Sequence, residues 1–269
     1  MSKVIAIAGM GWLGHTLAQR LQLSGYRVKG SVTSLTKATS FQKSGFNTYP
    51  LILTEDGVTG EVVGFLKNVD VLLIMIPPGL KNNTGANYTL KMRHFLIEIE
   101  KTTLSKVILV SSTSVYDDEQ GKVTEKDQPQ PKTDSGRQLL AVEQLYFNAP
   151  NFQTSVVRFG GLFGGSRQPV RYLSGRKNLS NGIAPVNLIH RDDCLGILSE
   201  IIKRDAFGHI FNAVAPDHPS KEDYYNTVAR QLSVEPPSYS EEKEEEFIQV
   251  DSENIARILD YSFTHRLLS

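Results

Sequence analysis

The sequence predicts an α/β protein, with a Rossmann-like, doubly wound parallel sheet and a smaller C-terminal lobe. Over the first two-thirds of the 269 residues, short apolar runs alternate with segments of helical spacing. Several of these runs are apolar on both faces, as expected of strands that helices cover from both sides. A glycine-rich turn, GMGWLG, follows the first run directly. Right-handed crossovers then give a doubly wound sheet.

The expected strands and helices alternate along the first part of the chain. The strands are expected at residues 3–9, 26–32, 46–53, 69–78 and 106–112. The helices between them are expected at residues 12–25, 35–44, 60–67 and 86–101. Segment 117–132 is too polar for a core, so we expect a surface loop there.

A helix over 134–147, TDSGRQLLAVEQLYF from Thr133, opens the second part, and Ser135 and Gly136 are expected to begin it. The elements expected after it are a strand running into a glycine-rich turn (153–164), an irregular segment (165–186), a helix (191–203), a strand (209–214), a helix (220–233) and a solvated charge run (240–246). We assign residues 1–159 to the Rossmann domain, to which residues 187–214 return, and residues 160–269 to the smaller, interleaved lobe.

Composition limits the classes of partner. The 29 basic and 29 acidic side chains balance, so we expect no binding to nucleic acid or to an anionic membrane. The longest apolar run, VDVLLIMIPPG, is too short to span a bilayer. Cys194 is the only cysteine, which excludes an intrachain disulfide and fits a reducing, cytoplasmic location. The six histidines show no metal-ligand spacing, so we expect no metal.

The glycines of the GMGWLG turn form the pattern G-x-G-x-x-G between a strand and a helix, which indicates dinucleotide binding. Gly9 would permit the tight turn, Gly11 would let a pyrophosphate approach, and Gly14 would let helix and strand pack closely. The helix N-terminus, at Trp12 and Leu13, would offer backbone N–H groups to the phosphates. The alternative is a tight turn without a ligand.

The end of the second strand bears on which dinucleotide binds. NAD sites usually have an acidic residue there, about 20 residues after the glycines, whereas KGSVTSLTKA (29–38) has none before Glu55. Thr33 and Ser34 would donate to a 2′-phosphate, and Lys37 would neutralise it. We therefore favour NADP. NAD remains the alternative, because the arginine typical of NADP sites is also missing.

Four later segments carry a family resemblance, namely VILVSSTSVY (107–116), VVRFGGLFG (156–164), VNLIHRDDCLGIL (186–198) and HIFNAVAPDHPSKEDYYNTVARQL (209–232). In this order, and with the glycine turn, the chain resembles the extended and atypical short-chain dehydrogenases/reductases of the NAD-dependent epimerase/dehydratase type. The resemblance covers nearly the whole chain. It implies a Rossmann domain that holds the cofactor, with Pro77, Pro78 and Ser111 among its contacts, and a lobe that closes over a substrate.

The resemblance also locates the chemistry. Catalytic relatives use a serine after the fifth strand, which is Ser112 here, and a tyrosine with a lysine four residues later. Gly136 and Glu143 keep the register of that motif, which puts Ser135 at the tyrosine position and Leu139 at the lysine position. The tyrosine–lysine pair is therefore absent. A serine has no phenol that could exchange a proton, and a leucine has no charge that could lower the pKa of one.

Two other side chains are candidate proton donors. Tyr116 would supply a phenol, although an aromatic side chain at a strand end more often only packs. His190 is the second candidate, and its counterpart in relatives mostly fixes a loop through Asp193. Arg137, Arg167 and Arg176 would bind an anionic substrate, with a solvent-facing role as the alternative.

Two functions follow from these features. The first is an NADP-dependent oxidoreductase or epimerase-like enzyme that acts on a small carbonyl or sugar-derived substrate without the usual tyrosine–lysine pair. The second is a non-catalytic NADP(H)-sensing protein. We favour the enzyme, because hydride transfer needs positioning and a proton source rather than one fixed pair of residues. The oligomeric state does not follow from the sequence.

Overall fold

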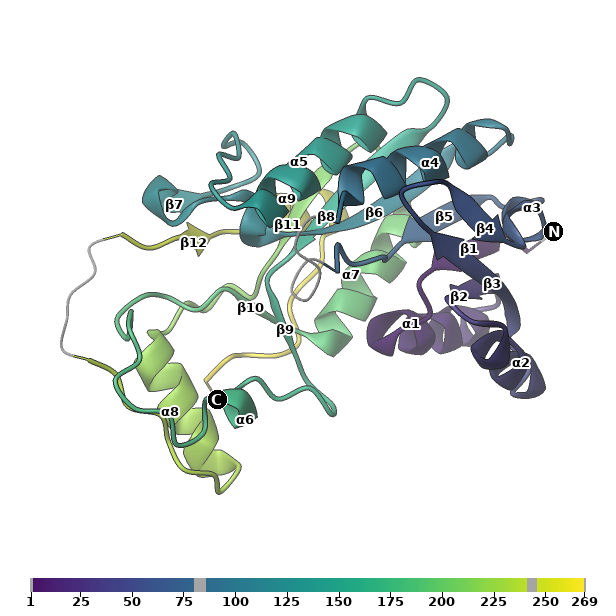
Figure 1. Ribbon diagram of the computed structural model, residues 1–269. Helices are drawn as coiled ribbons and strands as arrows, with labels where there is room; N and C mark the ends of the chain where they lie inside the picture. The colour runs from purple at the N-terminus through teal and green to yellow at the C-terminus, as the bar shows by residue number, and fades with distance from the viewer. Residues whose placement is uncertain (1, 80–85, 241–245, 269) are drawn as a thin grey trace. The chain divides into compact units, whose positions relative to one another are not determined.

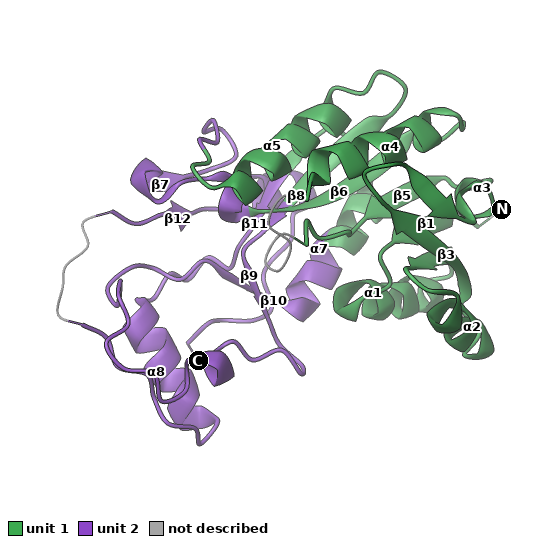
Figure 2. Ribbon diagram, viewed as in Figure 1, with its two compact units in different colours: residues 1–112, 131–157, 198–210 green, residues 113–130, 158–197, 211–269 purple. Residues whose placement is uncertain are grey.

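The computed structural model describes residues 2–79, 86–240 and 246–268 (Figure 1). Most of the charge run expected at 240–246 lies outside the described residues. The chain forms two compact units (Figure 2). Unit 1 comprises residues 1–112, 131–157 and 198–210, and unit 2 comprises residues 113–130, 158–197 and 211–269. Our assignment of residues 160–269 to substrate binding stays a prediction.

The main sheet among the described residues has eight strands in the order β11-β8-β6-β5-β1-β2-β3-β4. Its strands are β1 (Val4–Ala8), β2 (Arg27–Val32), β3 (Asn47–Leu53), β4 (Val58–Gly60), β5 (Val71–Ile74), β6 (Lys106–Ser112), β8 (Gln153–Phe159) and β11 (Ile210–Ala213). Strand β1 pairs in parallel with both β2 and β5, while β4 is an antiparallel edge on β3. The strand order reverses at β1, which confirms the doubly wound sheet.

The helices that belong wholly to unit 1 are α1 (Trp12–Leu23), α2 (Leu35–Lys43), α3 (Val62–Leu66), α4 (Tyr88–Glu100) and α5 (Asp134–Phe147). Figure 1 shows α4 and α5 on one face of the sheet and α1 and α2 on the other. Strands β1 and β5 are therefore buried along their whole length. Each buried leucine or isoleucine there stabilises the fold by about 2 kcal/mol.

Unit 2 contains shorter elements. They are β7 (Lys122–Val123), β9 (Gly161–Phe163), α6 (Val170–Leu173), β10 (Leu188–His190), α8 (Lys221–Gln231), β12 (Gln249–Val250) and α9 (Asn254–Leu259). Helix α7 (Arg191–Arg204) begins in unit 2 and ends in unit 1. The core of unit 2 includes Val186, Leu188 and Tyr224. No helix among the described residues is long and apolar enough to cross a membrane.

Most expected elements are confirmed, but α6 lies in the segment expected to be irregular (165–186), β4 was not expected, and three further expectations are corrected. Segment 117–132 is not only a surface loop, because β7 lies within it, pairs with β12 and buries Val123. The strand expected at 69–78 ends at Ile74, ahead of Pro77 and Pro78, which lack the N–H groups that a strand interior needs. Helix α5 is capped not by Ser135 but by Thr133, whose hydroxyl accepts a hydrogen bond from the Gly136 N–H.

Candidate functional site

The glycine turn joins β1 to α1 at the point where the strand order reverses. Gly9 has a φ of +110°, and a Cβ there would lie 2.8 Å from the carbonyl oxygen of Met75. A Cβ on Gly14 would lie only 2.2 Å from the carbonyl oxygen of Gly9. Both positions therefore require glycine for the chain to turn and for α1 to approach β1.

Gly11 differs from the other two glycines, because a Cβ there would meet no atom within 4 Å. It is the N-cap of α1 and offers no side chain to the N–H groups of the first turn, which begins with Trp12 and Leu13. The first N–H groups of an α-helix point out of its N-terminal end, where the helix dipole is positive. The turn thus has open space in front of hydrogen-bond donors, as an anion requires.

Strand β2 makes hydrogen bonds to the glycine turn. The hydroxyl oxygen of Ser31 accepts a hydrogen bond from Gly9 N (3.2 Å), and the Ser31 carbonyl accepts one from Met10 N (2.8 Å). A Cβ on Gly30 would lie 2.5 Å from the Met10 side chain. Sequence reasoning missed Gly30 and Ser31, although two small residues inside a strand are a signal of close backbone approach.

The segment after β2 carries the residues expected to select the cofactor. Ser34 caps α2, and its oxygen accepts from Lys37 N, a bond that does not use the hydroxyl proton. Thr33 and Lys37 are exposed, and the first turn of α2 has no acidic residue. Lys29 does not belong to this group, because its Nζ donates to the carbonyls of Gly64 and Lys67. Burial lowers the pKa of Lys29.

Strand β6 and helix α5 are joined by a buried hydrogen bond. Ser111 Oγ donates to Glu143 Oε1 across 2.5 Å, and both side chains are less than 10% exposed. Ser112, the last residue of β6, is half-buried. Pro77 and Pro78 follow β5, where the Tyr88 hydroxyl donates to the Ile76 carbonyl. The cofactor and catalytic roles of these residues stay predictions.

Ser135 and Leu139, the positions at which we expect the tyrosine and lysine of catalytic relatives, lie on α5. Leu139 is 6% exposed and belongs to the core, while Ser135 is half-buried. A buried leucine supplies neither a charge nor a hydrogen-bond donor. Arg137, on the same helix, is exposed, and its Nη1 donates to the Lys132 carbonyl.

In unit 2 the Tyr116 hydroxyl belongs to a buried polar network. It accepts from Arg158 Nη1 (2.7 Å), and its proton faces the Thr124 carbonyl (2.9 Å) and Asn212 Oδ1 (3.2 Å). Burial raises the pKa of Tyr116, an effect that Arg158 and Asn212 partly offset. Tyr116 is 5% exposed and Arg158 is 2% exposed. This arrangement favours a structural role for Tyr116 over proton donation.

His190 ends β10, and its ring stacks on that of His265 with 3.7 Å between centroids. Its Nδ1 accepts a hydrogen bond from the backbone N–H of Asp192. Burial lowers the pKa of His190, and the neighbouring His265 lowers it further. The buried carboxylate of Asp193 accepts hydrogen bonds from the side chain of Tyr261 and the backbone of Thr264, and so fixes a loop.

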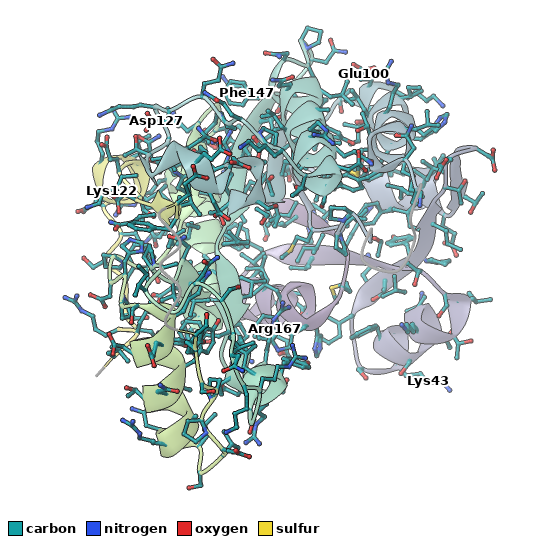
Figure 3. All side chains as sticks on the ribbon, turned by 60° about the vertical axis from the view of Figure 1, so that its left-hand side comes forward. Lys43, Glu100, Lys122, Asp127, Phe147 and Arg167 are labelled. Atoms are coloured by element: carbon teal, nitrogen blue, oxygen red, sulfur yellow. The ribbon has the colours of Figure 1, made fainter. Side chains whose placement is uncertain are left out.

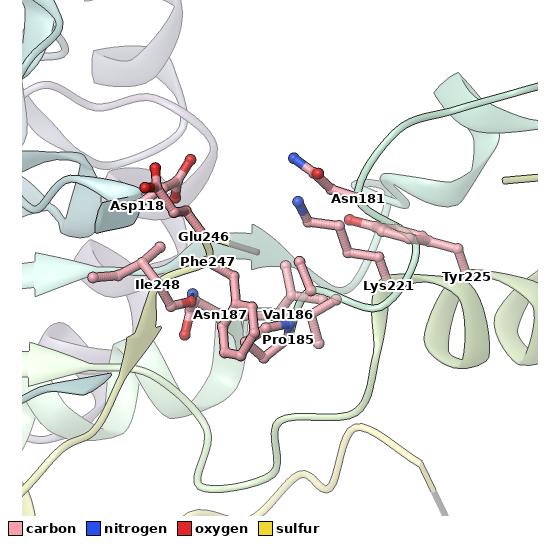
Figure 4. A pocket seen from close by; sticks show the side chains of 12 residues that line it. Asp118, Asn181, Pro185, Val186, Asn187, Lys221, Tyr225, Glu246, Phe247 and Ile248 are labelled. Atoms are coloured by element: carbon pink, nitrogen blue, oxygen red, sulfur yellow. Dashed lines mark hydrogen bonds between the residues drawn. The ribbon is translucent and has the colours of Figure 1, made fainter. Parts of the chain in front are cut away.

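Unit 2 also contains a cavity of about 150 Å³. Figure 4 shows Lys221 and Asn181 extending from one side of it, with Asp118 and Glu246 on the other and Phe247 between them. The aromatic ring of Tyr225 completes the side that carries Lys221. The cavity therefore combines apolar surface with both signs of charge.

The two arginines expected in this lobe are exposed. Arg167 lies on the surface of unit 2 (Figure 3), and neither it nor Arg176 is among the residues that line the cavity. Sequence reasoning missed Asn181 and Lys221, because nothing in their local spacing relates them to each other.

The chain was compared with protein-family models, with curated proteins and with solved structures. No protein-family model matches the chain. Protein YeeZ of Escherichia coli strain K12 is 34% identical over 239 residues, which cover 88% of this chain and 86% of YeeZ.

Three solved structures share the fold. UDP-N-acetylglucosamine 4-epimerase from Bacillus cereus has a TM-score of 0.79 at 16% identity, covering 99% of this chain and 96% of that one. UDP-glucuronic acid 4-epimerase from Bacillus cereus, in complex with UDP-glucuronic acid and NAD, has a TM-score of 0.79 at 19% identity, covering 98% and 95%. A short-chain dehydrogenase/reductase superfamily protein from Agrobacterium tumefaciens, with bound NAD, has a TM-score of 0.78 at 14% identity, covering 98% and 93%.

These structures show the fold, which is that of the extended and atypical short-chain dehydrogenases/reductases of the epimerase/dehydratase type. The fold that the resemblance implied is confirmed. The chain belongs to the family of Protein YeeZ.

The buried network leads to a prediction for Tyr116. Tyr116→Phe removes the hydroxyl that Arg158 donates to, so the free energy of unfolding should fall by about 1–3 kcal/mol. Urea denaturation measures this change, with Tyr172→Phe as the matched control because Tyr172 is 74% exposed. Equal stability of the two variants would show that the network contributes nothing.

Proposed function

We propose that the chain binds a nicotinamide dinucleotide in unit 1 and acts on a small, sugar-derived or carbonyl substrate held by unit 2. The observation that carries the proposal is the glycine turn, which combines two glycines that must lack a side chain with an open position at Gly11. Solved structures of this fold bind NAD, and one also binds UDP-glucuronic acid. These ligands support the proposal by analogy of fold.

Within this proposal the dinucleotide is NADP rather than NAD. Helix α2 has no acidic residue in its first turn that would repel a 2′-phosphate. The Ser34 hydroxyl keeps its proton for donation, and the Lys37 side chain is exposed beside it. The NAD found with structural relatives makes NAD the alternative.

One side of the cavity of unit 2 suits the anionic group of a sugar-derived substrate, while Asp118 and Glu246 on the other side would repel it. Lys221 would bind a phosphate or carboxylate, Asn181 would hydrogen-bond hydroxyl groups, and Phe247 would stack on a flat ring. Arg137, Arg167 and Arg176 do not line this cavity, and their role in binding an anionic substrate stays a prediction.

The proposed reaction has to proceed without a tyrosine whose pKa is lowered by a neighbouring lysine. The dinucleotide, when bound, supplies or accepts a hydride. Ser112, at the end of β6, would orient the substrate oxygen. Tyr116 is assigned a structural role because its hydroxyl is buried between Arg158 and Asn212. The proton would then come from His190, from water or from the substrate itself.

A non-catalytic, dinucleotide-sensing protein is the second candidate. The burial of Leu139 favours it, because the side chain at that position cannot reach a ribose with a charge or a hydrogen bond. Both candidates require the glycine turn. They differ in whether a carbonyl substrate is turned over.

Binding at the turn is tested with Gly11→Val. Its φ of −84° allows a side chain, so the fold should persist, while the added methyl groups occupy the space that a phosphate needs. Calorimetry should show NADP affinity falling about a hundredfold or more, about 2.7 kcal/mol. Gln19→Val, at an exposed position of the same helix, is the control and should bind normally. Unchanged affinity in Gly11→Val would refute the site.

Cofactor choice is tested with Lys37→Ala. The unmodified protein should bind NADP more tightly than NAD, and loss of one exposed phosphate contact should weaken NADP binding about fivefold, about 1 kcal/mol, without changing NAD binding. Lys43→Ala changes the same residue type at the other end of α2, where Lys43 is exposed (Figure 3), and should change neither affinity. Equal affinities of the unmodified protein for the two cofactors would contradict the NADP assignment.

Catalysis is tested by following NADPH consumption with a panel of carbonyl compounds. The enzyme proposal expects turnover that Ser112→Ala reduces and that Ser135→Ala changes less than about tenfold, about 1.4 kcal/mol of barrier. A hundredfold loss in Ser135→Ala would show that Ser135 is a catalytic acid. Tight NADPH binding with no turnover on any compound would favour the sensing protein.

A further inference from the structure

The cavity of unit 2 has two walls of opposite charge. Figure 4 shows the carboxylates of Asp118 and Glu246 together on one side, the acidic wall, and Lys221, Asn181 and Tyr225 on the other, the basic wall. Among the residues that the structure describes, no ion pair neutralises Asp118, Glu246 or Lys221. The proposed function uses only the basic wall, so the acidic wall has no role in it.

The acidic wall results from the parallel pairing of β7 with β12. Gln249 N donates to the Gly121 carbonyl (2.9 Å), and a capping box over residues 117–120 fixes the turn before β7. Because the two strands run in the same direction, the residues that precede them lie at the same end of the pair. Asp118 precedes β7 and Glu246 precedes β12, so two negative charges meet there. Such a pair favours a cation beside it.

The basic wall is formed by the start of α8 and the segment before β10. Lys221 N donates to the Ala184 carbonyl (2.8 Å), and Glu222 N donates to the Gly182 carbonyl (3.0 Å). Tyr225 is four residues after Lys221 and therefore lies on the same face of α8. Burial raises the pKa of Tyr225, which keeps its phenol neutral. The charge that lines this wall is therefore the Lys221 ammonium group.

Asn187 joins the two walls. Its Nδ2 donates to the Ile248 carbonyl (2.8 Å), and its Oδ1 accepts from Val250 N (2.9 Å). These bonds tie the segment that contains Glu246 to the segment that is bonded to α8. The opposite charges are thus fixed on either side of the cavity, and Lys221 forms no ion pair across it within the described ranges.

Two further features describe the ligand. Asn181 Oδ1 is buried and has no hydrogen-bond partner in the described part of the chain. An unpaired buried acceptor is unfavourable, and a ligand hydroxyl group that donates to it would remove that cost. The cavity volume of about 150 Å³ is enough for a six-membered ring, and Phe247 gives apolar surface for the face of that ring.

We propose that the cavity takes a dipolar ligand, a single sugar ring that carries both an anionic group and a primary ammonium group. The anionic group, a phosphate or carboxylate, binds Lys221, and the ammonium group binds Asp118 and Glu246. The sugar-derived and anionic character of the ligand rests on the proposed function, and the ammonium group is added by the acidic wall. A ligand with only negative charge is repelled by that wall, so the cavity discriminates in favour of the amine.

The test compares two sugar phosphates that differ in one group. Glucosamine 6-phosphate carries an ammonium group where glucose 6-phosphate carries a hydroxyl group. Calorimetry with the full chain, at a pH of about 6.5, keeps the carboxylates ionised and the amine protonated. No dinucleotide is added. Glucosamine 6-phosphate should bind about tenfold more tightly than glucose 6-phosphate.

Variants assign this preference to the two walls. Combining Asp118→Asn with Glu246→Gln should bring the two affinities to within about twofold of each other, because both partners of the amine are neutral. Lys221→Met should weaken both sugar phosphates about tenfold and keep the preference for the amine. Glu119→Gln is the matched control, since it removes a charge next to Asp118 but outside the cavity lining, and it should bind as the unmodified protein does.

Asp118 and Glu246 are exposed, so their double variant should fold, and it carries the test if Lys221→Met unfolds. Circular dichroism establishes that each variant is folded. The proposal is overturned if the unmodified protein binds the two sugar phosphates equally, or binds neither below about 10 mM. It is also overturned if the folded double variant keeps the preference for the amine.

These outcomes are distinguishable from a failure of the proposed function. Because no dinucleotide is present, a chain that fails to bind NADP would still show the preference for the amine if the cavity has the proposed role. Normal NADP binding together with equal affinities for the two sugar phosphates would overturn the dipolar ligand alone.

Discussion

The close approach of α1 to β1 is the constraint on which unit 1 depends. A Cβ at Gly14 would overlap the carbonyl oxygen of Gly9, so α1 can begin where it does only because both residues are glycine. This approach brings the N-terminus of α1 to the carboxyl end of β1, at the reversal of strand order between β1 and β5. In open α/β sheets that position is where ligands bind. Ser31 on β2 completes the turn by accepting the Gly9 N–H.

Helix α5 is firmly attached to the sheet, but in the register that we predict it carries no tyrosine–lysine pair. The buried bond from Ser111 to Glu143 ties it to β6 and so positions the neighbouring Ser112. Leu139, at the position where we expect the lysine of catalytic relatives, packs in the core and presents no charge. Tyr116, the nearest phenol in sequence to Ser112, is held in a polar network of unit 2. In that register α5 helps to position Ser112 but supplies no phenol, so the proton would come from His190, from water or from the substrate itself.

The sequence predicts well those elements whose periodicity spans several residues. Strand β1 and helix α1 are such elements, since a buried strand, three glycines and an amphipathic helix follow each other directly. The pairing of β7 with β12 could not be predicted, because strands of two residues have no periodicity and their pairing is tertiary. The same holds for the contacts of Ser31 with the glycine turn and for the approach of His265 to His190, which involve residues distant in sequence. Thr133 could have been identified as the cap of α5, since threonine is a preferred N-cap residue and the acidic Asp134 follows it in the first turn.

A crystal structure of the chain grown with saturating NADP tests the central claim, that a dinucleotide binds at the glycine turn, most directly. The account predicts pyrophosphate oxygens over Gly11, about 3 Å from the N–H groups of the first turn of α1. It also predicts that Leu139 of α5 makes no hydrogen bond to the nicotinamide ribose. A dinucleotide bound elsewhere, or a glycine turn that stays without ligand at saturation, would contradict it.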